Sequence, residues 1–255
     1  MNLTCDLSLA ARYHSPSQQA RVLSEDWFAR NAYCLACDAD ELQKTPANTK
    51  ATDFVCPKCS HRYELKAFKN RRPKSLVDGA FGTMMEQVRA GKAPTLCLLE
   101  RTQDWQIKGL TAIHSSFLLP EAIRARTPLS EIAERSKWVG CTILLDRIDN
   151  NADVEVIENG VVQPAEDVRR SFQRFLPLAK KRVVQRGWTV LTLRTIRALK
   201  MASFVTRDLY ALERVFAKAY PNNHHIEEKI RQQLQILRDL GVLAFDGRGK
   251  YRLLD

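Results

Sequence analysis

Four cysteines in two closely spaced pairs constrain the fold of this chain more than any other feature. Cys34 and Cys37 form one Cys-x2-Cys pair, Cys56 and Cys59 form a second, and 18 residues separate the pairs. This spacing is typical of a zinc ribbon, in which each pair makes a tight turn and directs two thiolates at one tetrahedral ion. We therefore expect residues 34–59 to hold Zn²⁺. Because four thiolates close the coordination shell, this ion should be structural.

The alternatives for these cysteines are four unrelated buried or reactive thiols, or a redox site. The doubled spacing makes both weaker than the metal site. The helical period disappears between the pairs, where a polar loop surrounds residues 46–49, so something other than an apolar core must hold the segment. The three remaining cysteines, Cys5, Cys97 and Cys141, are isolated and are expected to pack as small apolar groups.

Length and hydropathy limit the class of protein. A chain of 255 residues can form one large domain or two smaller ones, and we expect two. No segment approaches the roughly 18 consecutive apolar residues of a membrane span, and the first residues lack the pattern of an export signal. We therefore expect a cytoplasmic protein with reduced or metal-bound cysteines and no membrane partner. The sequence leaves the oligomeric state open, and a monomer is the working assumption.

The positive charge of the chain is unevenly distributed. The formal net charge is +11, and Lys181 to Asp255 holds 15 basic and 7 acidic residues, a net charge of +8. A basic excess attracts any polyanion, although alone it favours nucleic-acid binding no more than mere solubility. The charge therefore indicates the C-terminal part as the place to look for a nucleic-acid partner.

The N-terminal part reads as an α/β domain that ends near residue 182. Ser15, Pro16 and Gln18 have the chemistry of a capped helix start, and Ser24 could begin a second helix. Strands are predicted at 62–66, 95–99, 105–112 and 140–145, and helices at 79–90 and 120–136. Strands mixed with helices in this way predict an α/β or α+β domain.

The C-terminal part, residues 183–255, has the pattern of a winged helix. Helices are predicted at 192–200, 206–219 and 223–240, and residues 242–253 have strand-turn-strand chemistry. Within the last helix, apolar residues fall on one side and leave a polar face that contains Arg231, Gln232 and Gln235. These side chains have the donors and acceptors that read base edges in a major groove. Arg248 and Lys250 lie where a wing could meet phosphate, and the alternative is an ordinary surface helix or a protein-binding module.

An acidic and basic constellation lies beside the second cysteine pair. Glu64 and Lys66 are two residues apart in a predicted strand, so their side chains leave the same face. If residues 53–55 and 62–66 are antiparallel strands, Asp53 can approach Glu64. Two converging carboxylates can bind Mg²⁺, which would activate water for phosphodiester hydrolysis, and a lysine can stabilise the charge that develops.

A Glu-x-Lys pair is weak evidence by itself, because charged residues alternate on many exposed strand faces. Two features of the context favour a catalytic interpretation. The charge of the chain independently suggests a nucleic-acid partner, and the stretch 66–74 adds Lys69, Arg71, Arg72 and Lys74 next to the proposed site. Phosphate contact is one use for these residues, and a solvated loop is the alternative.

With these parts in place, the sequence resembles the DpnI family of methyl-directed restriction endonucleases over essentially its full length. The likeness is strongest in the C-terminal run 225–239 and in residues 247–252. The likeness is looser at residues 67–77 and 146–216, which lie between the matching segments. The other matching segments are residues 17–27, the four paired cysteines, Asp53, residues 64–66, 78–80, 83–85 and 138–141.

The resemblance implies an α/β PD-(D/E)XK nuclease core with a zinc-ribbon insert, followed by a mainly helical winged-helix domain. It implies Mg²⁺-dependent cleavage of double-stranded DNA at GATC sites that contain N6-methyladenine. The catalytic positions of the family match Asp53, Glu64 and Lys66. The resemblance implies that Asp53, Glu64 and the Leu65 backbone surround the magnesium ion. The zinc ligands of the family match Cys34, Cys37, Cys56 and Cys59.

The resemblance also assigns residues that contact DNA. Trp138 matches a residue that could contact the adenine methyl groups, although a core tryptophan is the alternative reading. The recognition helix and the wing are expected to use Lys229, Arg231, Gln232, Gln235, Arg248 and Lys250.

The sequence is compatible with three functions. The function that we expect is that of a methyl-directed type II endonuclease. The second is a DNA-binding regulator with a zinc ribbon and a winged helix but without cleavage activity, and the third is a repair nuclease that is indifferent to methylation.

Overall fold

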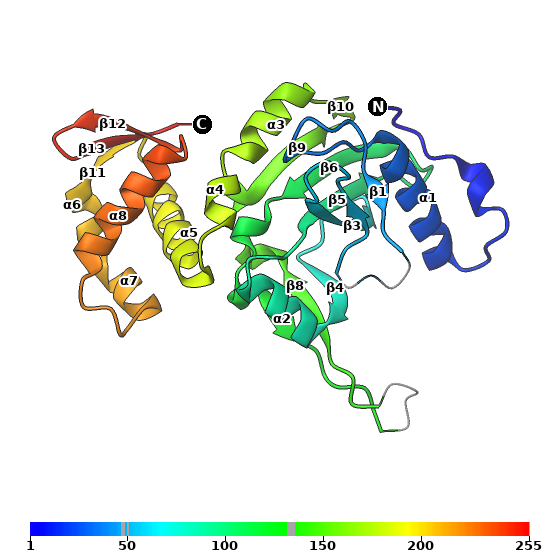
Figure 1. Ribbon diagram of the computed structural model, residues 1–255, viewed down its shortest axis with the longest axis horizontal. Coiled ribbons are helices and arrows are strands. Elements are labelled where there is room, and N and C mark those ends of the chain that lie inside the picture. Colours follow the sequence, from blue (N-terminus) through cyan, green and yellow to red (C-terminus); the bar gives the residue numbers. More distant parts are fainter. Residues whose placement is uncertain (47–48, 50, 132–135, 255) are drawn as a thin grey trace. The chain divides into compact units, whose positions relative to one another are not determined.

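The computed structural model describes residues 1–46, 49, 51–131 and 136–254. The chain divides into two units, Met1–Lys180 and Lys181–Asp255, which are described here one at a time (Figure 1). In the described residues, no helix combines the length and the apolar character that crossing a membrane requires.

A mixed seven-stranded sheet is the centre of the N-terminal unit. Its strand order is β1-β2-β3-β5-β6-β9-β10. β3 and β5 run parallel, with Glu64 opposite Leu96 and Lys66 opposite Leu98, and the other described neighbours pair antiparallel. The strands are β1 (Gln43–Lys44), β2 (Phe54–Val55), β3 (Arg62–Lys69), β5 (Thr95–Arg101), β6 (Ile107–Ile113), β9 (Asp153–Glu158) and β10 (Val161–Val162).

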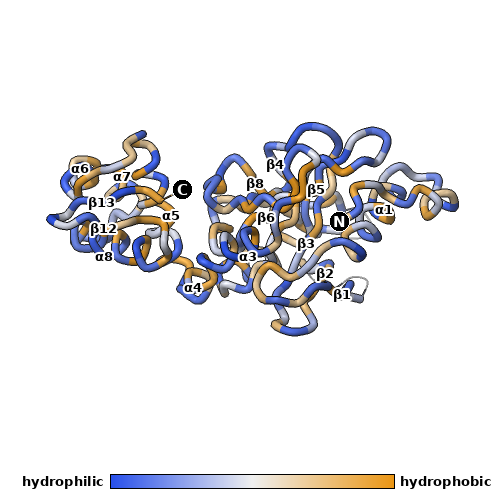
Figure 2. The backbone as a smooth tube through the Cα atoms, turned by 90° about the horizontal axis from the view of Figure 1, so that it is seen from above, coloured by the Kyte–Doolittle hydropathy of each residue, from blue (hydrophilic) through white to orange (hydrophobic). Residues whose placement is uncertain are grey.

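One face of this sheet is covered by helices and by the cysteine segment. α1 (Pro16–Asn31) contacts β3 and α3 (Ala165–Gln173) contacts β9. In Figure 2 the backbone of β5 is mostly orange, as expected of a strand that is buried on both faces. The core on this side combines large side chains from the helices with alternate residues of the strands, among them Trp27, Phe28, Phe172, Tyr63, Leu99 and Leu110.

α1 is one helix, so of the two possibilities that the sequence left open, a second start at Ser24 does not occur. Ser24 is buried inside the helix, where its hydroxyl donates to the carbonyl of Ala20 at 2.5 Å. Ser15 precedes the helix and Pro16 opens it, as expected, but no side-chain cap is formed, because the Ser15 hydroxyl bonds that of Ser17. The apolar side formed by Leu23, Trp27 and Phe28 continues past Ser24, so packing on the sheet maintains the helix.

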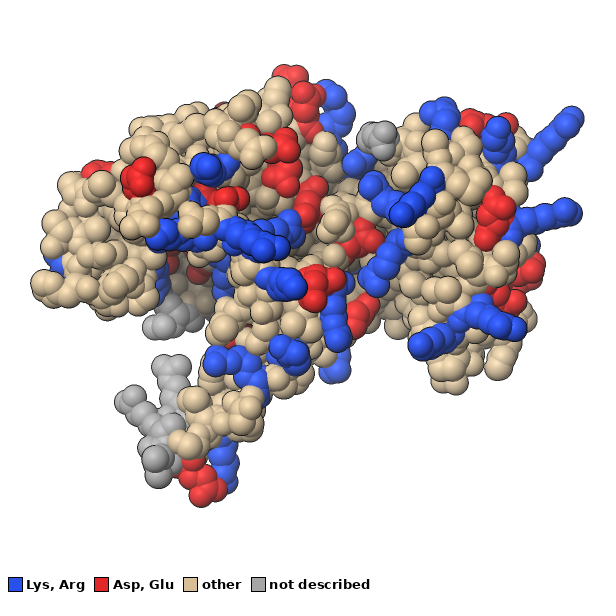
Figure 3. Space-filling view, turned by 180° about the vertical axis from the view of Figure 1, so that it is seen from behind, with Lys and Arg blue, Asp and Glu red and all other residues tan. Residues whose placement is uncertain are grey.

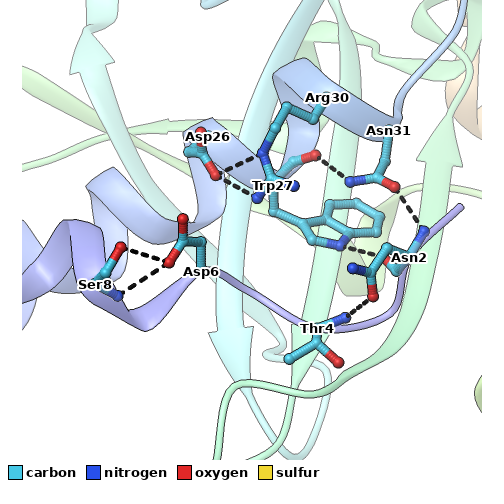
Figure 4. A network of polar contacts seen from close by, with 8 residues as sticks. All are labelled: Asn2, Thr4, Asp6, Ser8, Asp26, Trp27, Arg30 and Asn31. Atoms are coloured by element: carbon cyan, nitrogen blue, oxygen red, sulfur yellow. Dashed lines mark hydrogen bonds and ion pairs between the residues drawn. The ribbon is translucent and has the colours of Figure 1, made fainter.

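Polar contacts attach the N-terminal segment to α1 (Figure 4). The indole N–H of Trp27 donates to the carbonyl of Asn2 at 2.6 Å, and the amide of Asn2 donates to the side chain of Asn31 at 2.8 Å. The Asn2 side chain in turn accepts from the amide of Thr4 at 3.0 Å. These bonds give the buried indole its partner while the ring lies in the core.

The N-terminal unit also contains a second sheet of three strands, in the order β4-β8-β7. Its strands are β4 (Ser75–Ala80), β8 (Gly140–Leu144) and β7 (Ile123–Ala125). α2 (Phe81–Arg89) packs on this sheet and also reaches the first one, since Gln87 accepts from the guanidinium of Arg62 at 2.8 Å. The expected helix at 79–90 therefore exists, but the strand before it was not predicted.

The helix expected at 120–136 is wrong. Residues Pro120–Ala122 form one short 3₁₀ turn, after which Ile123–Ala125 pairs with β8, with Ile123 opposite Ile143. Pairing of a buried strand residue outweighs the helical propensity of this segment, and Pro128 disfavours a helix beyond it. Residues 132–135, which the expected helix included, lie outside the described residues.

Short helical segments complete the N-terminal unit. They are the α-helix α4 (Leu176–Ala179) and the 3₁₀ turns η1 (Leu7–Ala10), η2 (Ser115–Phe117), η3 (Pro120–Ala122), η4 (Leu145–Arg147) and η5 (Asn150–Ala152).

The C-terminal unit is a winged helix. Its three-stranded sheet has the order β11-β13-β12, and α8 packs against α5, α6 and α7. The helix expected at 192–200 is longer and begins at Val183, and the one expected at 206–219 is two helices. The elements are α5 (Val183–Ala198), β11 (Ser203–Val205), α6 (Thr206–Tyr210), α7 (Glu213–Ala219), α8 (Ile226–Asp239), β12 (Leu243–Gly247) and β13 (Lys250–Leu253).

The core of this unit contains the expected apolar side of α8. Every member of the predicted series is buried, namely Ile226, Ile230, Leu234, Leu237 and Leu240. Trp188 of α5 stacks on Tyr220 with ring centroids 4.2 Å apart. Gln233 is also buried on α8, and its side-chain carbonyl accepts from the hydroxyl of Thr189 at 2.8 Å.

Candidate active site and metal centre

The four paired cysteines converge on one point. The Sγ atoms of Cys34 and Cys59 are 3.6 Å apart, those of Cys37 and Cys56 are 3.5 Å apart, and all four lie within 4.8 Å of one another. Four thiolates around one zinc ion at 2.3 Å would be separated by about 3.8 Å, so the cluster has the size of a tetrahedral zinc site. The predicted grouping is therefore present, and these residues could hold Zn²⁺.

Hydrogen bonds favour the thiolate at Cys56, whereas burial raises the pKa of the Cys34 and Cys59 thiols. Burial alone would raise the pKa of the Cys56 thiol, but bonds from the backbone N–H groups of Cys59 and Lys58 outweigh it and lower that pKa to about 7. The hydroxyl of Tyr63 lies 3.2 Å from the sulfur of Cys34 and accepts from the amide of Leu35 at 2.9 Å. Tyr63 is buried in β3, directly before Glu64, so the cluster is attached to the strand that carries the proposed site.

The β2 and β3 strands bring Asp53 to Glu64 as the antiparallel pairing predicts. Phe54 lies opposite Tyr63, and the amide of Asp53 donates to the carbonyl of Tyr63 at 2.9 Å. The Asp53 carboxylate then accepts from the amide of Leu65 at 2.8 Å. The turn that contains Cys56 and Cys59 connects the two strands, so one hairpin forms half of the cysteine cluster and positions both carboxylates.

Lys66 lies between two carboxylates. Its Nζ is 2.7 Å from Oε1 of Glu64 and 2.9 Å from Oδ1 of Asp78. Glu64 and Lys66 share one face of β3, whereas Asp78 comes from β4 in the other sheet. The side chains of Glu64 and Asp78 are each 6% exposed, and that of Lys66 is 20% exposed. The charged groups are therefore largely removed from water and interact strongly.

Burial and the charges nearby change the pKa values of these groups. Burial raises the pKa of Glu64 to about 8, although Lys66 opposes this. Burial also raises the pKa of Asp53, against the bond from Leu65. Burial would lower the pKa of Lys66, but the charges of Glu64 and then Asp78 outweigh it and raise that pKa. Burial would raise the pKa of Asp78, but the charge of Lys66 outweighs it and lowers that pKa. Such opposed shifts in a small cluster are typical of a functional site.

These carboxylates line a large pocket of 530 Å³. Oε2 of Glu64 and Oδ2 of Asp78 are buried there and have no hydrogen-bond partner among the described residues. The pocket is walled by the end of β4 and the start of α2, and Trp138 closes part of it. Its lining residues are Thr49, Ala51, Thr52, Asp53, Glu64, Asp78, Gly79, Ala80, Thr83, Met84 and Trp138.

Trp138 is half-buried and lines this pocket instead of the core. Its carbonyl accepts from the amide of Leu129 at 3.0 Å, which fixes the backbone at the base of the 129–138 segment. Gly140 leaves room for the indole ring, because a Cβ at this position would lie 2.9 Å from two ring carbons. The core alternative for Trp138 therefore does not apply, and the ring is available to a molecule in the pocket.

The basic residues at the end of β3 and after it differ in their contacts. Arg72 forms a close bidentate pair with Asp153, and Lys69 donates to Gln103 at 2.6 Å. Arg71 and Lys74 are exposed. Phosphate contact by Arg71 and Lys74 remains a prediction.

The residues predicted to read DNA lie on the surface of the C-terminal unit, and some of them are already hydrogen-bonded within the protein. Arg231 donates to the hydroxyl of Tyr210 at 2.6 Å and pairs with Glu228 at 3.2 Å. Lys229 is half-buried and donates to the side chain of Gln232 at 2.7 Å. Gln235 is exposed. Arg231 and Lys229 would therefore have to exchange protein partners for DNA.

The wing presents two exposed cations. Arg248 and Lys250 lie at the turn between β12 and β13, where Gly247 and Gly249 have φ values of +87° and +72°. Positive φ favours glycine, and here it forms the tight turn that projects the two side chains. On the face shown in Figure 3, lysine and arginine side chains project from the C-terminal unit, as expected of a surface that meets a polyanion.

Two family comparisons cover almost the whole chain. The family described as DpnI, the Dam-replacing family, matches residues 1–181. A second, described as DpnI_C, the Dam-replacing HTH domain, matches residues 184–253. The chain belongs to the DpnI family. Membership implies a nuclease, and the HTH domain implies DNA binding, which confirms the resemblance inferred from the sequence.

Neutralising the wing should weaken DNA binding without changing sequence preference. We expect Arg248→Ala and Lys250→Ala each to reduce the salt dependence of binding by about one counterion, because each removes one phosphate contact. Fluorescence anisotropy with labelled duplexes at several salt concentrations, in EDTA, measures this slope. Arg170→Ala, which removes an exposed arginine of α3, is the control, and an equal loss in that variant would contradict a specific role of the wing.

Proposed function

We propose that this chain is a type II restriction endonuclease that cleaves double-stranded DNA at GATC sites containing N6-methyladenine. The observation that carries the proposal is that Asp53 and Glu64 line one pocket of 530 Å³, with the ammonium of Lys66 2.7 Å from Glu64. Family membership supports nuclease chemistry, whereas GATC and the methyl group come from the resemblance of the sequence. Asp53, Glu64 and Lys66 are the proposed catalytic residues.

The donor set of the pocket suits a hard divalent cation. Asp53 and Glu64 offer carboxylate oxygens, and Oε2 of Glu64 is buried without a partner among the described residues. Mg²⁺ prefers such oxygen ligands and keeps several waters. We propose that Asp53 and Glu64, with the Leu65 backbone, would hold it. When bound, the ion would neutralise phosphate charge and make a coordinated water more acidic.

The protein groups position and stabilise the reacting phosphate. The bond from the Leu65 amide orients Asp53, and the β3 strand holds Glu64 and Lys66 on one face. The raised pKa keeps Lys66 charged, so its ammonium can donate to the oxyanion that forms as the phosphodiester is attacked. Asp53 and Glu64 line a pocket of 530 Å³, and a purely structural ion pair would need no such space beside it.

Digestion of one GATC-containing plasmid tests the proposal. The plasmid is prepared with and without adenine methylation and incubated with Mg²⁺ and either the wild-type protein or Lys66→Ala. We expect cutting of the methylated plasmid alone, lost in the variant. Binding without cutting would support a DNA-binding regulator, and equal cutting of both plasmids would support a nuclease with another specificity.

Trp138 is proposed to contact the methyl groups. Its ring lines the pocket, and an apolar surface favours a methylated adenine over one whose amino group retains both hydrogens. We expect Trp138→Ala to lower the ratio of methylated to unmethylated cleavage about 10-fold, since each methyl group contributes about 0.8 kcal/mol when buried and GATC carries two. The ratio of single-turnover rates on the two plasmids measures it.

Trp105→Ala is the matched control for this ratio. The Trp105 ring lies against the guanidinium of Arg101, 3.5 Å from its centroid, and takes no part in lining the pocket. A similar fall in the ratio for both variants would show that loss of an indole, and not its position, is responsible.

A further inference from the structure

We propose that Asp78 is a positioning residue that holds the Lys66 ammonium in place when Glu64 is occupied by a metal ion. The inference rests on the proposed function, because it assigns a task within the same site. It concerns a residue of β4, outside the strand pair that carries Asp53, Glu64 and Lys66.

The observation is that Lys66 has two carboxyl partners at nearly equal distances. Its Nζ is 2.7 Å from Glu64 and 2.9 Å from Asp78. Both carboxylates are 6% exposed, so neither charge is appreciably screened by water. The two partners approach from different sheets, and the lysine side chain therefore bridges β3 and β4.

The Glu64 carboxylate cannot neutralise both the Lys66 ammonium and a bound divalent cation. In the proposed reaction the Glu64 carboxylate would bind the divalent ion, and the charge of that ion would repel the nearby Lys66 ammonium. A lysine with a side chain that is 20% exposed would then lose its main counter-ion in a poorly hydrated place. Asp78 is the group that remains, and its Oδ1 already accepts from Nζ.

The position of Asp78 is fixed by its strand. Its Cα pairs with that of Cys141 in β8, and the register shifts between Asp78 and Ala80 as the chain turns into α2. The side chain therefore reaches the pocket from a well-defined backbone. Oδ1 of Asp78 is engaged by Nζ of Lys66, whereas its Oδ2 is buried without a hydrogen-bond partner among the described residues, so the contact with Lys66 supports the assignment and the double-mutant cycle below tests it against the metal.

Asp78→Asn tests the assignment, because it removes the charge and keeps the shape. Single-turnover cleavage of methylated DNA at saturating Mg²⁺ is expected to slow about 100-fold, as for loss of one donor aligned with the transition state. DNA affinity measured with Ca²⁺ in place of Mg²⁺ should change less than about 2-fold. Asp78→Glu, which keeps a carboxylate within reach of Nζ, should recover part of the rate. Asp26→Asn removes a carboxylate paired with Arg30 on α1 and should leave the rate unchanged.

A double-mutant cycle separates action through Lys66 from direct metal binding. In a Lys66→Met protein, whose residual rate is followed with excess enzyme over hours, Asp78→Asn should change cleavage less than about 3-fold. A loss of about 100-fold in both backgrounds would overturn the proposal and assign Asp78 to the metal or the water. A rate for Asp78→Asn equal to that of the wild type would overturn it as well.

The outcomes distinguish this inference from the proposed function. If the wild-type protein cuts methylated DNA while Asp78→Asn cuts equally well, the inference fails and the proposed function stands. If the wild-type protein cuts no DNA, both fail together. Thermal melting confirms that each variant is folded, and Asp78→Ser replaces Asp78→Asn if the latter is unfolded at the assay temperature.

Discussion

Replacing Glu64 with glutamine should reduce cleavage by about 1,000-fold, a loss of about 4 kcal/mol of transition-state stabilisation. The substitution keeps the size of the side chain and removes only its charge. It would deprive the proposed cation of a ligand and Lys66 of a counter-ion at 2.7 Å. Single-turnover cleavage of the methylated plasmid over a range of Mg²⁺ concentrations measures the effect, and saturation should also shift to higher Mg²⁺.

Glu155→Gln is the matched control for this loss. Glu155 is a carboxylate of β9 in the same sheet, where it accepts from Thr111 at 2.8 Å and where burial raises its pKa. It takes no part in lining the pocket, so cleavage should be unchanged. Binding of methylated DNA in EDTA should be equal for the wild type and both variants. A Glu64→Gln protein that cuts at the wild-type rate would contradict the assignment of Glu64.

The hairpin at the centre of the site could be predicted from the sequence, because its information is local. The Cys-x2-Cys spacing indicates a tight turn, and the alternation in 62–66 indicates a strand. Together these place Asp53 opposite the strand of Glu64, and the structure shows the bond from the Leu65 amide to Asp53.

Asp78 could not be predicted as part of the site. It lies 12 residues after Lys66, in a strand that belongs to another sheet, and its contact with Lys66 depends on how the two sheets pack. No periodicity in 75–80 indicates a partner for it, since its strand alternates between exposed and half-buried positions. The sequence offered one signal for Asp78, which is the likeness of residues 78–80 to the DpnI family, and that likeness gives no role for the side chain.

The error at 120–136 has the same origin. That segment contains residues of good helix propensity, but Ile123 pairs with β8, a strand that follows it in the sequence. Partners that lie later in the chain outweigh local propensity, and a single sequence gives no register for such pairing. The same limit left β4 unpredicted, because its partner in the sheet is also β8.

Substituting a cysteine of the cluster should have the second large effect. We expect Cys56→Ser to abolish zinc binding and to lower the melting temperature of the N-terminal unit by about 10 °C, since a structural zinc contributes folding free energy and 1 kcal/mol corresponds to about 2–4 °C for a unit of this size. Zinc content by atomic spectroscopy, expected at one ion per wild-type chain, and melting followed by circular dichroism measure the two effects.

The cluster should also control cleavage, through Tyr63. Its hydroxyl contacts Cys34 and Leu35 at one end of the ring, and its backbone directly precedes Glu64 at the other. Loss of the metal should release Tyr63, and Glu64 with it, so Cys56→Ser should cut poorly even where it remains folded. Cys5→Ser, which alters a buried thiol outside the cluster, should retain zinc and cleavage. If Cys56→Ser behaved like Cys5→Ser in all three measurements, the four cysteines would not be a structural metal site, and the hairpin would be stabilised by its side-chain packing alone.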